Sequence, residues 1–297
     1  MTDEDYGVML PQRIPAVHIN WTLPFRVRNP RVDYYVEDQE LLSTILSALL
    51  WRKLNGPIKL YTDPVGLKYY QRIQLLDLWD GGIDDQTLAG ISPQHIDPEI
   101  FWAAGKLFAV RQEKAPFFMM DTDLMVWRPI CQLAAPHRLM ALHRESLATI
   151  ECYIPFHLLK TRPDYLPNPL WDWEEDPFNT ALVFFGDDTF LQQYTASAIN
   201  FMTDNLERPM EMVSQMVFAE QRLFAMVAKA SEIPVATFLD YPEQECGITH
   251  IWGAKAEARS NPAGYRALCA EMCRALQLCF PQSLELPVVN DLMKKYM

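Results

Sequence analysis

The sequence has no run of apolar residues long enough to cross a bilayer, since none approaches the roughly 18 residues that a spanning helix needs. Its N-terminus, MTDEDYGVML, is acidic and has no apolar signal core. The six cysteines form no Cys-x-x-Cys pair, and their apolar surroundings are typical of reduced, buried thiols. These absences argue against a transmembrane segment, a signal peptide and a disulfide framework, so we expect a cytoplasmic protein.

Positive charge is also scarce, because the formal net charge is −12 at pH 7. The basic stripe that DNA or RNA binding requires is therefore missing, and we expect no nucleic-acid partner. A nucleotide ligand is not excluded, because one metal ion and one or two local cations can hold a diphosphate. Apolar residues make up 49 % of the 297 residues, which allows a sizeable core.

The order of the expected elements is that of an α/β protein. Residues 13–25 contain a first strand, residues 37–54 have the apolar period of a helix, and residues 58–61 follow as a second strand. This βαβ unit predicts a parallel sheet. Further expected elements are helices at 64–79, 97–113, 188–204 and 210–230 and strands at 138–142, 180–185 and 235–238. Without a repeat or a linker, we expect a single domain over residues 1–297, with a mostly helical extension from about 256 to 297.

The most informative segment is PFFMMDTD, from Pro116 to Asp123. Its apolar residues predict a buried strand, and Asp121 and Asp123 fall at the carboxyl end, where open α/β sheets bind ligands. Hard divalent ions accept carboxylate oxygens and share them with substrate phosphates. The segment therefore predicts a metal-diphosphate site for Mn²⁺ or Mg²⁺. The alternative is a turn whose carboxylates cap the next segment.

A second candidate segment, THIWGAK, runs from Thr249 to Lys255. His250 would supply a nitrogen ligand to the same cation. Gly253 would let the backbone approach a phosphate, and Lys255 would place a positive charge beside it. A purely structural histidine is the alternative.

Three polar residues elsewhere are weaker candidates. Asn179, at the entrance of an expected strand, suits sugar hydroxyls or satisfies a local turn. Glu220 either faces a cleft or belongs to the polar stripe of an amphipathic helix. Lys106 either reaches the donor or lies on the polar side of its helix.

Two irregular regions complete the candidate site. The segment 161–179 has no clear helical or strand period, and a stretch of that length without regular structure is often a functional loop. Within it, Trp171 and Trp173 either stack on a sugar ring or pack on the surface. Nucleotide-binding residues are expected in the loops after the first two strands: Trp21, Thr22 and Asp63.

Together these segments resemble a GT-A type glycosyltransferase, a Rossmann-like fold with a mostly parallel central sheet flanked by helices. The strand that ends in Asp121-Thr122-Asp123 matches the Asp-x-Asp motif of that fold, and Asn179-Thr180-Ala181 resembles its Asn-x-Gly strand. The segment from His250 to Lys255 is similar to the His-x-x-Gly-x-x-Lys signature of glycosyltransferase family 8, the glycogenin and galactosyltransferase-like family. As in a divergent member, Ala181 replaces glycine and the last spacing is one residue short.

The resemblance implies a hexosyltransferase-like enzyme that uses a nucleotide-diphosphate sugar, with UDP favoured, and Mn²⁺ or Mg²⁺. Asp123 and His250 would be metal ligands, Asp121 would bind the metal or the ribose, and Lys255 would neutralise the leaving diphosphate. The acceptor, a glycan, lipid or protein, is not implied. An inverting enzyme needs a carboxylate base, for which Glu220 is a candidate; the family with the histidine motif retains configuration, which we favour slightly.

Two other functions remain open at this stage. A haloacid-dehalogenase-type phosphatase or phosphotransferase also carries a strand followed by Asp-x-Asp, but that family expects Thr or Val where this chain has Met125. A GT-A-like domain without activity would bind only a sugar or a protein.

Overall fold

The computed structural model describes residues 13–209, 212–242, 244, 246–251 and 260–297. Among these residues a seven-stranded sheet has the order β3-β2-β1-β4-β7-β6-β8. Its strands are β1 (Ala16–Ile19), β2 (Ile58–Tyr61), β3 (Ile83–Asp84), β4 (Phe117–Met120), β6 (Leu139–Ala141), β7 (Leu182–Phe185) and β8 (Val235–Thr237). Within this described sheet β7 runs antiparallel to both neighbours, and all other pairs are parallel. The predicted α/β class with a mostly parallel sheet is confirmed.

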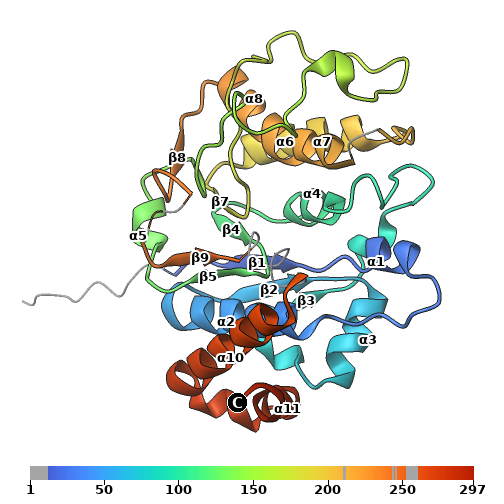
Figure 1. Cartoon of the computed structure of the whole chain (residues 1–297). Helices are drawn as coiled ribbons and strands as arrows, with labels where there is room; N and C mark the ends of the chain where they lie inside the picture. The colour runs from blue at the N-terminus through green and yellow to red at the C-terminus, as the bar shows by residue number, and fades with distance from the viewer. Residues whose placement is uncertain (1–12, 210–211, 243, 245, 252–259) are drawn as a thin grey trace, which may run out of the picture.

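Helices cover both faces of this sheet (Figure 1). They are α1 (Leu23–Arg28), α2 (Asp38–Leu54), α3 (Pro64–Arg72), α4 (Ala104–Val110), α5 (Cys131–Ala134), α6 (Asp188–Met202), α7 (Met212–Val217), α8 (Leu223–Ala230), α10 (Pro262–Cys279) and α11 (Pro287–Tyr296). Strand β4 feeds both layers, because successive side chains of a strand point to opposite faces. Phe118 and Met120 join the core that contains α2 and α10, whereas Phe117 and Met119 join the core that contains α4, α6 and α8.

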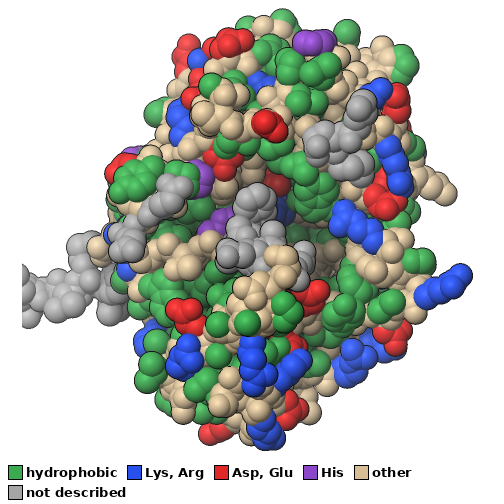
Figure 2. Space-filling view, viewed as in Figure 1, with side chains coloured by type: hydrophobic (Ala, Val, Ile, Leu, Met, Phe, Trp, Pro, Cys, Tyr) green, Lys and Arg blue, Asp and Glu red, His purple; other side chains and the backbone are tan. Residues whose placement is uncertain are grey.

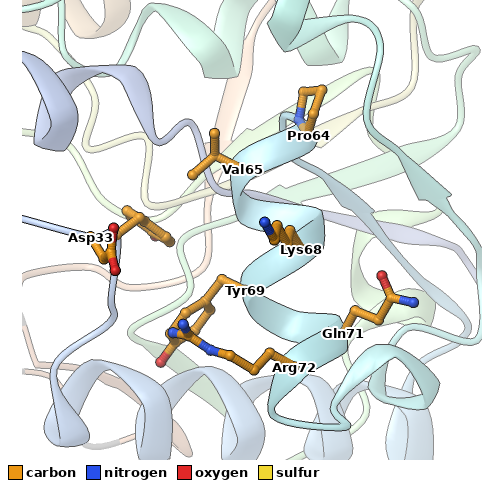
Figure 3. A pocket seen from close by; sticks show the side chains of 8 residues that line it. Asp33, Pro64, Val65, Lys68, Tyr69, Gln71 and Arg72 are labelled. Carbon is orange, nitrogen blue, oxygen red and sulfur yellow. The ribbon is translucent and has the colours of Figure 1, made fainter.

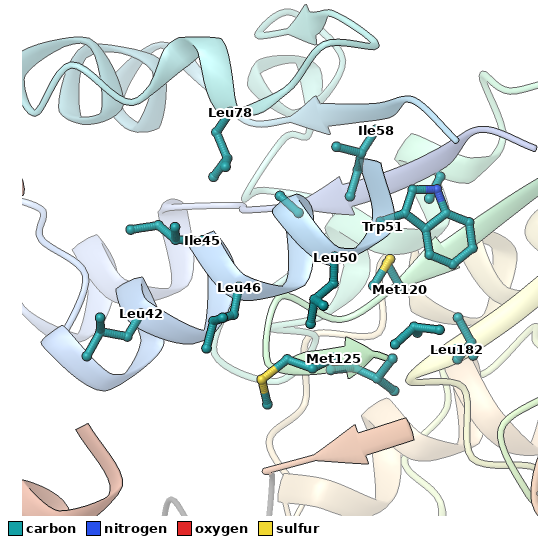
Figure 4. Packing of buried hydrophobic residues seen from close by; sticks show 14 of the residues in the cluster. Leu42, Ile45, Leu46, Leu50, Trp51, Ile58, Leu78, Met120, Met125 and Leu182 are labelled. Carbon is teal, nitrogen blue, oxygen red and sulfur yellow. The ribbon is translucent and has the colours of Figure 1, made fainter. Parts of the chain in front are cut away.

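Helix α2 is the main support beneath the acidic end of β4. Its sequence has acidic residues in the first turn and Arg52 and Lys53 in the last, which favours the helix dipole. Figure 4 shows its apolar side chains packed among residues of β2, β4, β5 and β7, including Met120 and Met125. Strand β5 (Leu124–Val126) lies directly after the Asp pair and forms a separate antiparallel ribbon with β9 (Ile248–His250). The turn between β4 and β5 is thereby fixed on both sides.

Three predicted helices differ from the structure. The helix expected at 64–79 ends at Arg72, because Gln74 adopts a positive φ of 56° that a helix cannot contain, and a short 3-10 helix over Leu76–Leu78 follows. The helix expected at 97–113 is limited to α4, because the Asp97 carboxylate accepts a hydrogen bond of 2.8 Å from the Glu99 amide and closes a local turn instead. The helix expected at 210–230 is interrupted by a π-helix over Phe218–Arg222, between α7 and α8. Such π-helical turns within α-helices are frequent at functional sites.

The C-terminal helices pack onto α2. The Tyr265 hydroxyl accepts a hydrogen bond of 3.2 Å from the Gln39 amide, and Lys295 and Tyr296 both bind Asp38. The tail contains α10 and α11, while the single-domain organisation and a mostly helical C-terminal extension from about 256 to 297 stay predictions. None of the described helices is long and apolar enough to cross a membrane.

Candidate active site

The carboxyl ends of β4 and β6 lie at the same edge of the sheet as the first residues of β7, because β7 is reversed. The Asp121 amide donates a hydrogen bond of 2.8 Å to the Ala181 carbonyl oxygen. This pairing brings Asn179 and Thr180, which precede β7, next to the acid pair. Figure 2 shows a hollow in the middle of one face of the molecule, with acidic, basic and histidine side chains on its walls.

Asp121, Asp123 and His250 meet at this edge, and their ligand atoms all lie within 4.8 Å of one another. The Leu124 amide donates to the Asp121 carbonyl oxygen at 3.1 Å, which closes a tight turn, and the β5–β9 register places His250 opposite Leu124. His250 Nε2 lies 3.6 Å from Asp123 Oδ1, too far for a hydrogen bond. It is buried and has no hydrogen-bond partner among the described residues. Two carboxylates around an orphaned imidazole nitrogen fit a divalent cation.

Lys106 of α4 lies beside this metal triad (Asp121, Asp123 and His250). Its Nζ is 2.6 Å from Asp121 Oδ1 and 2.7 Å from Glu220 Oε1. Burial lowers the pKa of Lys106, but the charges of Asp121 and Glu220 outweigh it and raise the pKa above the usual value. Burial raises the pKa of Asp121, and the ammonium of Lys106 opposes that shift. A permanent positive charge therefore stands next to the triad.

The approach of α4 depends on Gly105. A Cβ at this position would lie only 2.9 Å from Trp21 Cβ, so the helix can pack across Trp21 only with glycine there. Trp21 follows β1, so this contact fixes Lys106 against the same edge of the sheet.

Glu220 lies within the π-helix and is 5 % exposed. Its carbonyl oxygen accepts a hydrogen bond of 2.6 Å from the Tyr194 hydroxyl, and its Oε1 accepts one of 2.9 Å from Thr180. The alternative that Glu220 belongs to the solvated polar stripe of an amphipathic helix is therefore wrong, because its side chain points into the interior beside Lys106 and Thr180. Its predicted catalytic role stays a prediction.

Asn179 connects the site to residues that the sequence did not reveal. Its Oδ1 accepts a hydrogen bond of 3.1 Å from the Ala181 amide, which is the local turn considered above. Its Nδ2 donates to Glu145 Oε1 at 2.8 Å, and Tyr153 joins Glu145 to Gln221. Glu145 follows β6, so the rule that singled out Asp121 at a strand end would also have pointed to it.

Thr22 and Asp63 join the ends of β1 and β2. The Asp63 carboxylate accepts hydrogen bonds from the Thr22 amide (2.9 Å), the Thr22 hydroxyl, the Val65 amide (3.0 Å) and the Gly66 amide (3.1 Å). It therefore caps α3. Both side chains are almost fully buried, at 0 % and 4 % exposure. The structure gives them a structural task, and contact of Trp21, Thr22 and Asp63 with a nucleotide stays a prediction.

An open cavity of about 540 Å³ begins directly after Asp63, alongside α3 (Figure 3). Its lining combines aromatic and cationic side chains: Tyr34, Pro64, Val65, Lys68, Tyr69 and Arg72, with Asp33 and Gln71. The Tyr34 hydroxyl donates to Asn20 Oδ1 at 3.0 Å, so the cavity adjoins the end of β1. Strand β2 lies two places from β4 in the sheet, or about 10 Å.

The remaining candidates have different outcomes. Gly253 and Lys255 lie outside the described residues. Trp171 is buried, and Trp173 stacks on Phe218 at 5.6 Å with an interplanar angle of 5° while the Arg222 guanidinium lies 5.5 Å from its ring. The structure therefore shows packing contacts for both tryptophans, and sugar stacking by them stays a prediction.

The fold and the site define an α/β protein with a candidate metal site at the carboxyl edge of its sheet. The chain belongs to the family described as "Family of unknown function (DUF6734)", whose profile matches residues 25–283. A search of curated proteins gives no match.

Several solved glycosyltransferases are similar in structure, each with 11 % sequence identity. They are the bifunctional glycosyltransferase WbbM (77 % of this chain, 39 % of that chain, TM-score 0.41), mouse xyloside xylosyltransferase 1 (86 % and 94 %, 0.39) and the PaToxG glycosyltransferase (96 % and 85 %, 0.42). The chain thus spans well under half of the WbbM chain. Similarity at this level does not extend to activity, which has to be argued from the site.

Proposed function

We propose that this protein is a metal-dependent, GT-A type glycosyltransferase that transfers a sugar, hexosyltransferase-like, from a nucleotide-diphosphate sugar to a hydroxyl acceptor. The observation that carries the proposal is the triad of Asp121, Asp123 and His250 at the carboxyl edge of the sheet, with the ammonium of Lys106 beside it. Three ligands leave coordination positions open, which a diphosphate can fill, as divalent ions usually share substrate phosphates.

The triad would hold Mn²⁺ or Mg²⁺, with His250 favouring Mn²⁺ because imidazole is a poor ligand for the harder ion. A bound ion would supply Lewis-acid stabilisation of the negative charge on the departing diphosphate. Lys106 would add a fixed positive charge beside Asp121, at no reorganisation cost. Lys255 and Gly253 are proposed as further diphosphate contacts, on the sequence pattern alone.

The nucleoside would lie along the same edge, towards the cavity beside α3. The distance of about 10 Å between the ends of β2 and β4 is within the length of an extended nucleoside diphosphate. The aromatic and cationic lining suits a base and a negatively charged ligand. We favour UDP, the donor nucleotide that the sequence resemblance implies.

The surroundings of Glu220 favour a retaining reaction. Its Oε1 already accepts hydrogen bonds from the Lys106 ammonium and the Thr180 hydroxyl. The oxygen that a base would use is thus already engaged by two donors of this chain. We therefore propose Glu220 as the group that positions Lys106, and Asn179 as a sugar contact, rather than Glu220 as the base of an inverting reaction.

Isothermal titration calorimetry with UDP, in the presence and absence of Mn²⁺, tests this proposal. We expect UDP to bind when Mn²⁺ is present and the His250→Gln variant to lose that binding. The matched control is His95→Gln, since His95 pairs with Asp204 on the surface, away from the site. Binding of phosphate mimics without nucleotide binding would favour the phosphatase alternative, and no nucleotide binding under any condition would favour an inactive domain.

A further inference from the structure

A second polar cluster lies beside the metal triad, one residue further along two segments that already belong to the site. Asn179 precedes Thr180, just before β7, and Gln221 follows Glu220 in the π-helix. The hydrogen bond from the Thr180 hydroxyl to Glu220 holds these two segments together. Glu145 accepts a hydrogen bond of 2.8 Å from Asn179 Nδ2, and the Tyr153 hydroxyl contacts both Glu145 Oε2 and Gln221 Oε1. We call Glu145, Tyr153, Asn179 and Gln221 the polar quartet.

The polar quartet has more acceptors than donors. The Tyr153 hydroxyl has a single hydrogen, yet it contacts two acceptor oxygens. The Gln221 amide can turn its NH₂ towards Tyr153, which satisfies that contact. The spare capacity lies in Glu145, because a carboxylate offers about four acceptor sites and the contacts with Asn179 and Tyr153 use two of them. A half-buried carboxylate with spare acceptor capacity calls for a ligand that brings hydrogen-bond donors.

The quartet is both fixed and accessible. The Glu145 amide donates to the Pro177 carbonyl oxygen at 2.8 Å, and the Asn179 amide donates to that of His143 at 2.9 Å, so both backbones are held. Tyr153 is buried at 7 % exposure, whereas Glu145, Asn179 and Gln221 are only half-buried. Side chains held in place from behind and open in front are typical of a preorganised binding site.

We propose that the polar quartet binds the hydroxyl groups of the transferred sugar and thereby sets which sugar the protein accepts, with Glu145 as the principal hydrogen-bond acceptor. This inference rests on the proposed function, since the diphosphate at the triad would carry the sugar to the neighbouring polar surface. Sugar hydroxyls supply the missing donors, and the Asn179 amide can also donate to them. A site built to hydrogen-bond a ligand hydroxyl discriminates against a ligand that lacks it, because the matching acceptors are then left unpaired.

Calorimetry in the presence of Mn²⁺ with UDP, UDP-glucose and UDP-galactose separates this inference from the proposed function. We expect the wild-type protein to bind at least one UDP-sugar about tenfold more tightly than UDP, as one or two charge-assisted hydrogen bonds allow. Glu145→Ala should reduce that ratio to within about twofold, in the range of a lost hydrogen bond, and leave UDP affinity unchanged. Glu145→Gln, which keeps the volume, should act in the same direction and serves if the alanine variant fails to fold.

Glu175→Ala is the matched control, because Glu175 is a half-buried carboxylate in the same region that pairs with Arg144 and Lys229 outside the quartet. It should leave both affinities unchanged. The inference is overturned if the Glu145 variants keep the wild-type ratio, if Glu175→Ala lowers it equally, or if wild-type protein binds UDP but neither UDP-sugar more tightly. Failure of the wild-type protein to bind any of the three would instead contradict the proposed function.

Discussion

Replacing Asp123 by asparagine should remove the metal site without weakening the fold. Asp123 is 4 % exposed, and its ligand oxygen lies within 4.8 Å of that of Asp121. Two carboxylates at that distance repel each other by about 3.5 kcal/mol at an effective dielectric constant of 20. Lys106 offsets part of this repulsion through Asp121. We therefore expect the Asp123→Asn variant without metal to be as stable as the wild type or about 1 kcal/mol more stable.

The response to metal should differ between the two proteins. At a Mn²⁺ concentration one hundred times the dissociation constant, binding stabilises the folded state by about 2.7 kcal/mol. For a chain of this size the melting temperature should then rise by roughly 5 to 10 °C, at about 2 to 4 °C per kcal/mol. The variant loses one ligand and its charge, so its melting temperature should rise by less than about 2 °C.

Differential scanning calorimetry with and without Mn²⁺ measures both effects. Asp164→Asn is the control, because Asp164 is an exposed carboxylate paired with Arg162. It should show the full wild-type shift. The reasoning is refuted if Asp123→Asn keeps the wild-type shift, which would mean that Asp123 is no ligand. It is equally refuted if the variant unfolds without metal, which would make Asp123 a structural cap.

Three further predictions concern single residues. Lys106→Met should destabilise the metal-free protein by about 2 to 3 kcal/mol, because it leaves the buried Glu220 carboxylate and the partly buried Asp121 carboxylate without their cation, and Mn²⁺ should restore more stability to it than to the wild type in urea unfolding. Burial lowers the pKa of His18 to about 3, so the unfolded chain takes up a proton at a higher pH than the folded protein does. The free energy of unfolding therefore falls as the pH drops from 6.5 towards 3. His18→Gln should therefore reduce the loss of unfolding free energy between pH 7.5 and pH 5 by about 2 kcal/mol, and equal slopes in both proteins would contradict this. Trp173→Ala should lower stability by about 2 kcal/mol through its lost packing on Phe218 but leave Mn²⁺-dependent UDP binding intact; a selective loss of sugar affinity would contradict the assigned packing role.

The acidic end of β4 could be predicted because its signal is local. An apolar strand must be buried, and Asp121 and Asp123 directly follow it. Helix α2 could be predicted for the same reason, since its apolar period and charged ends lie within one segment. The sequence indicated that His250 lies near Asp121 and Asp123 only through the resemblance of its segment to a family motif. In the structure, the β5–β9 ribbon brings these residues together.

Features that depend on distant contacts could not be predicted. Glu145 and Tyr153 reach Asn179 and Gln221 only because β7 is reversed in the sheet, and a single sequence carries no direct sign of that direction. The π-helix around Glu220 lies within a mostly apolar segment that predicts only a helix, and nothing in that pattern singles out the π-helical turn. The predicted helix start at Asp97 was wrong because one carboxylate can cap a turn as well as a helix.

The most direct test of the central claim is a crystal grown with Mn²⁺ and UDP, with anomalous scattering recorded for manganese. The account predicts a manganese peak at bonding distance from Asp121, Asp123 and His250 Nε2, with diphosphate oxygens completing the coordination. A manganese peak elsewhere, or a UDP diphosphate bound away from these three side chains, would contradict it.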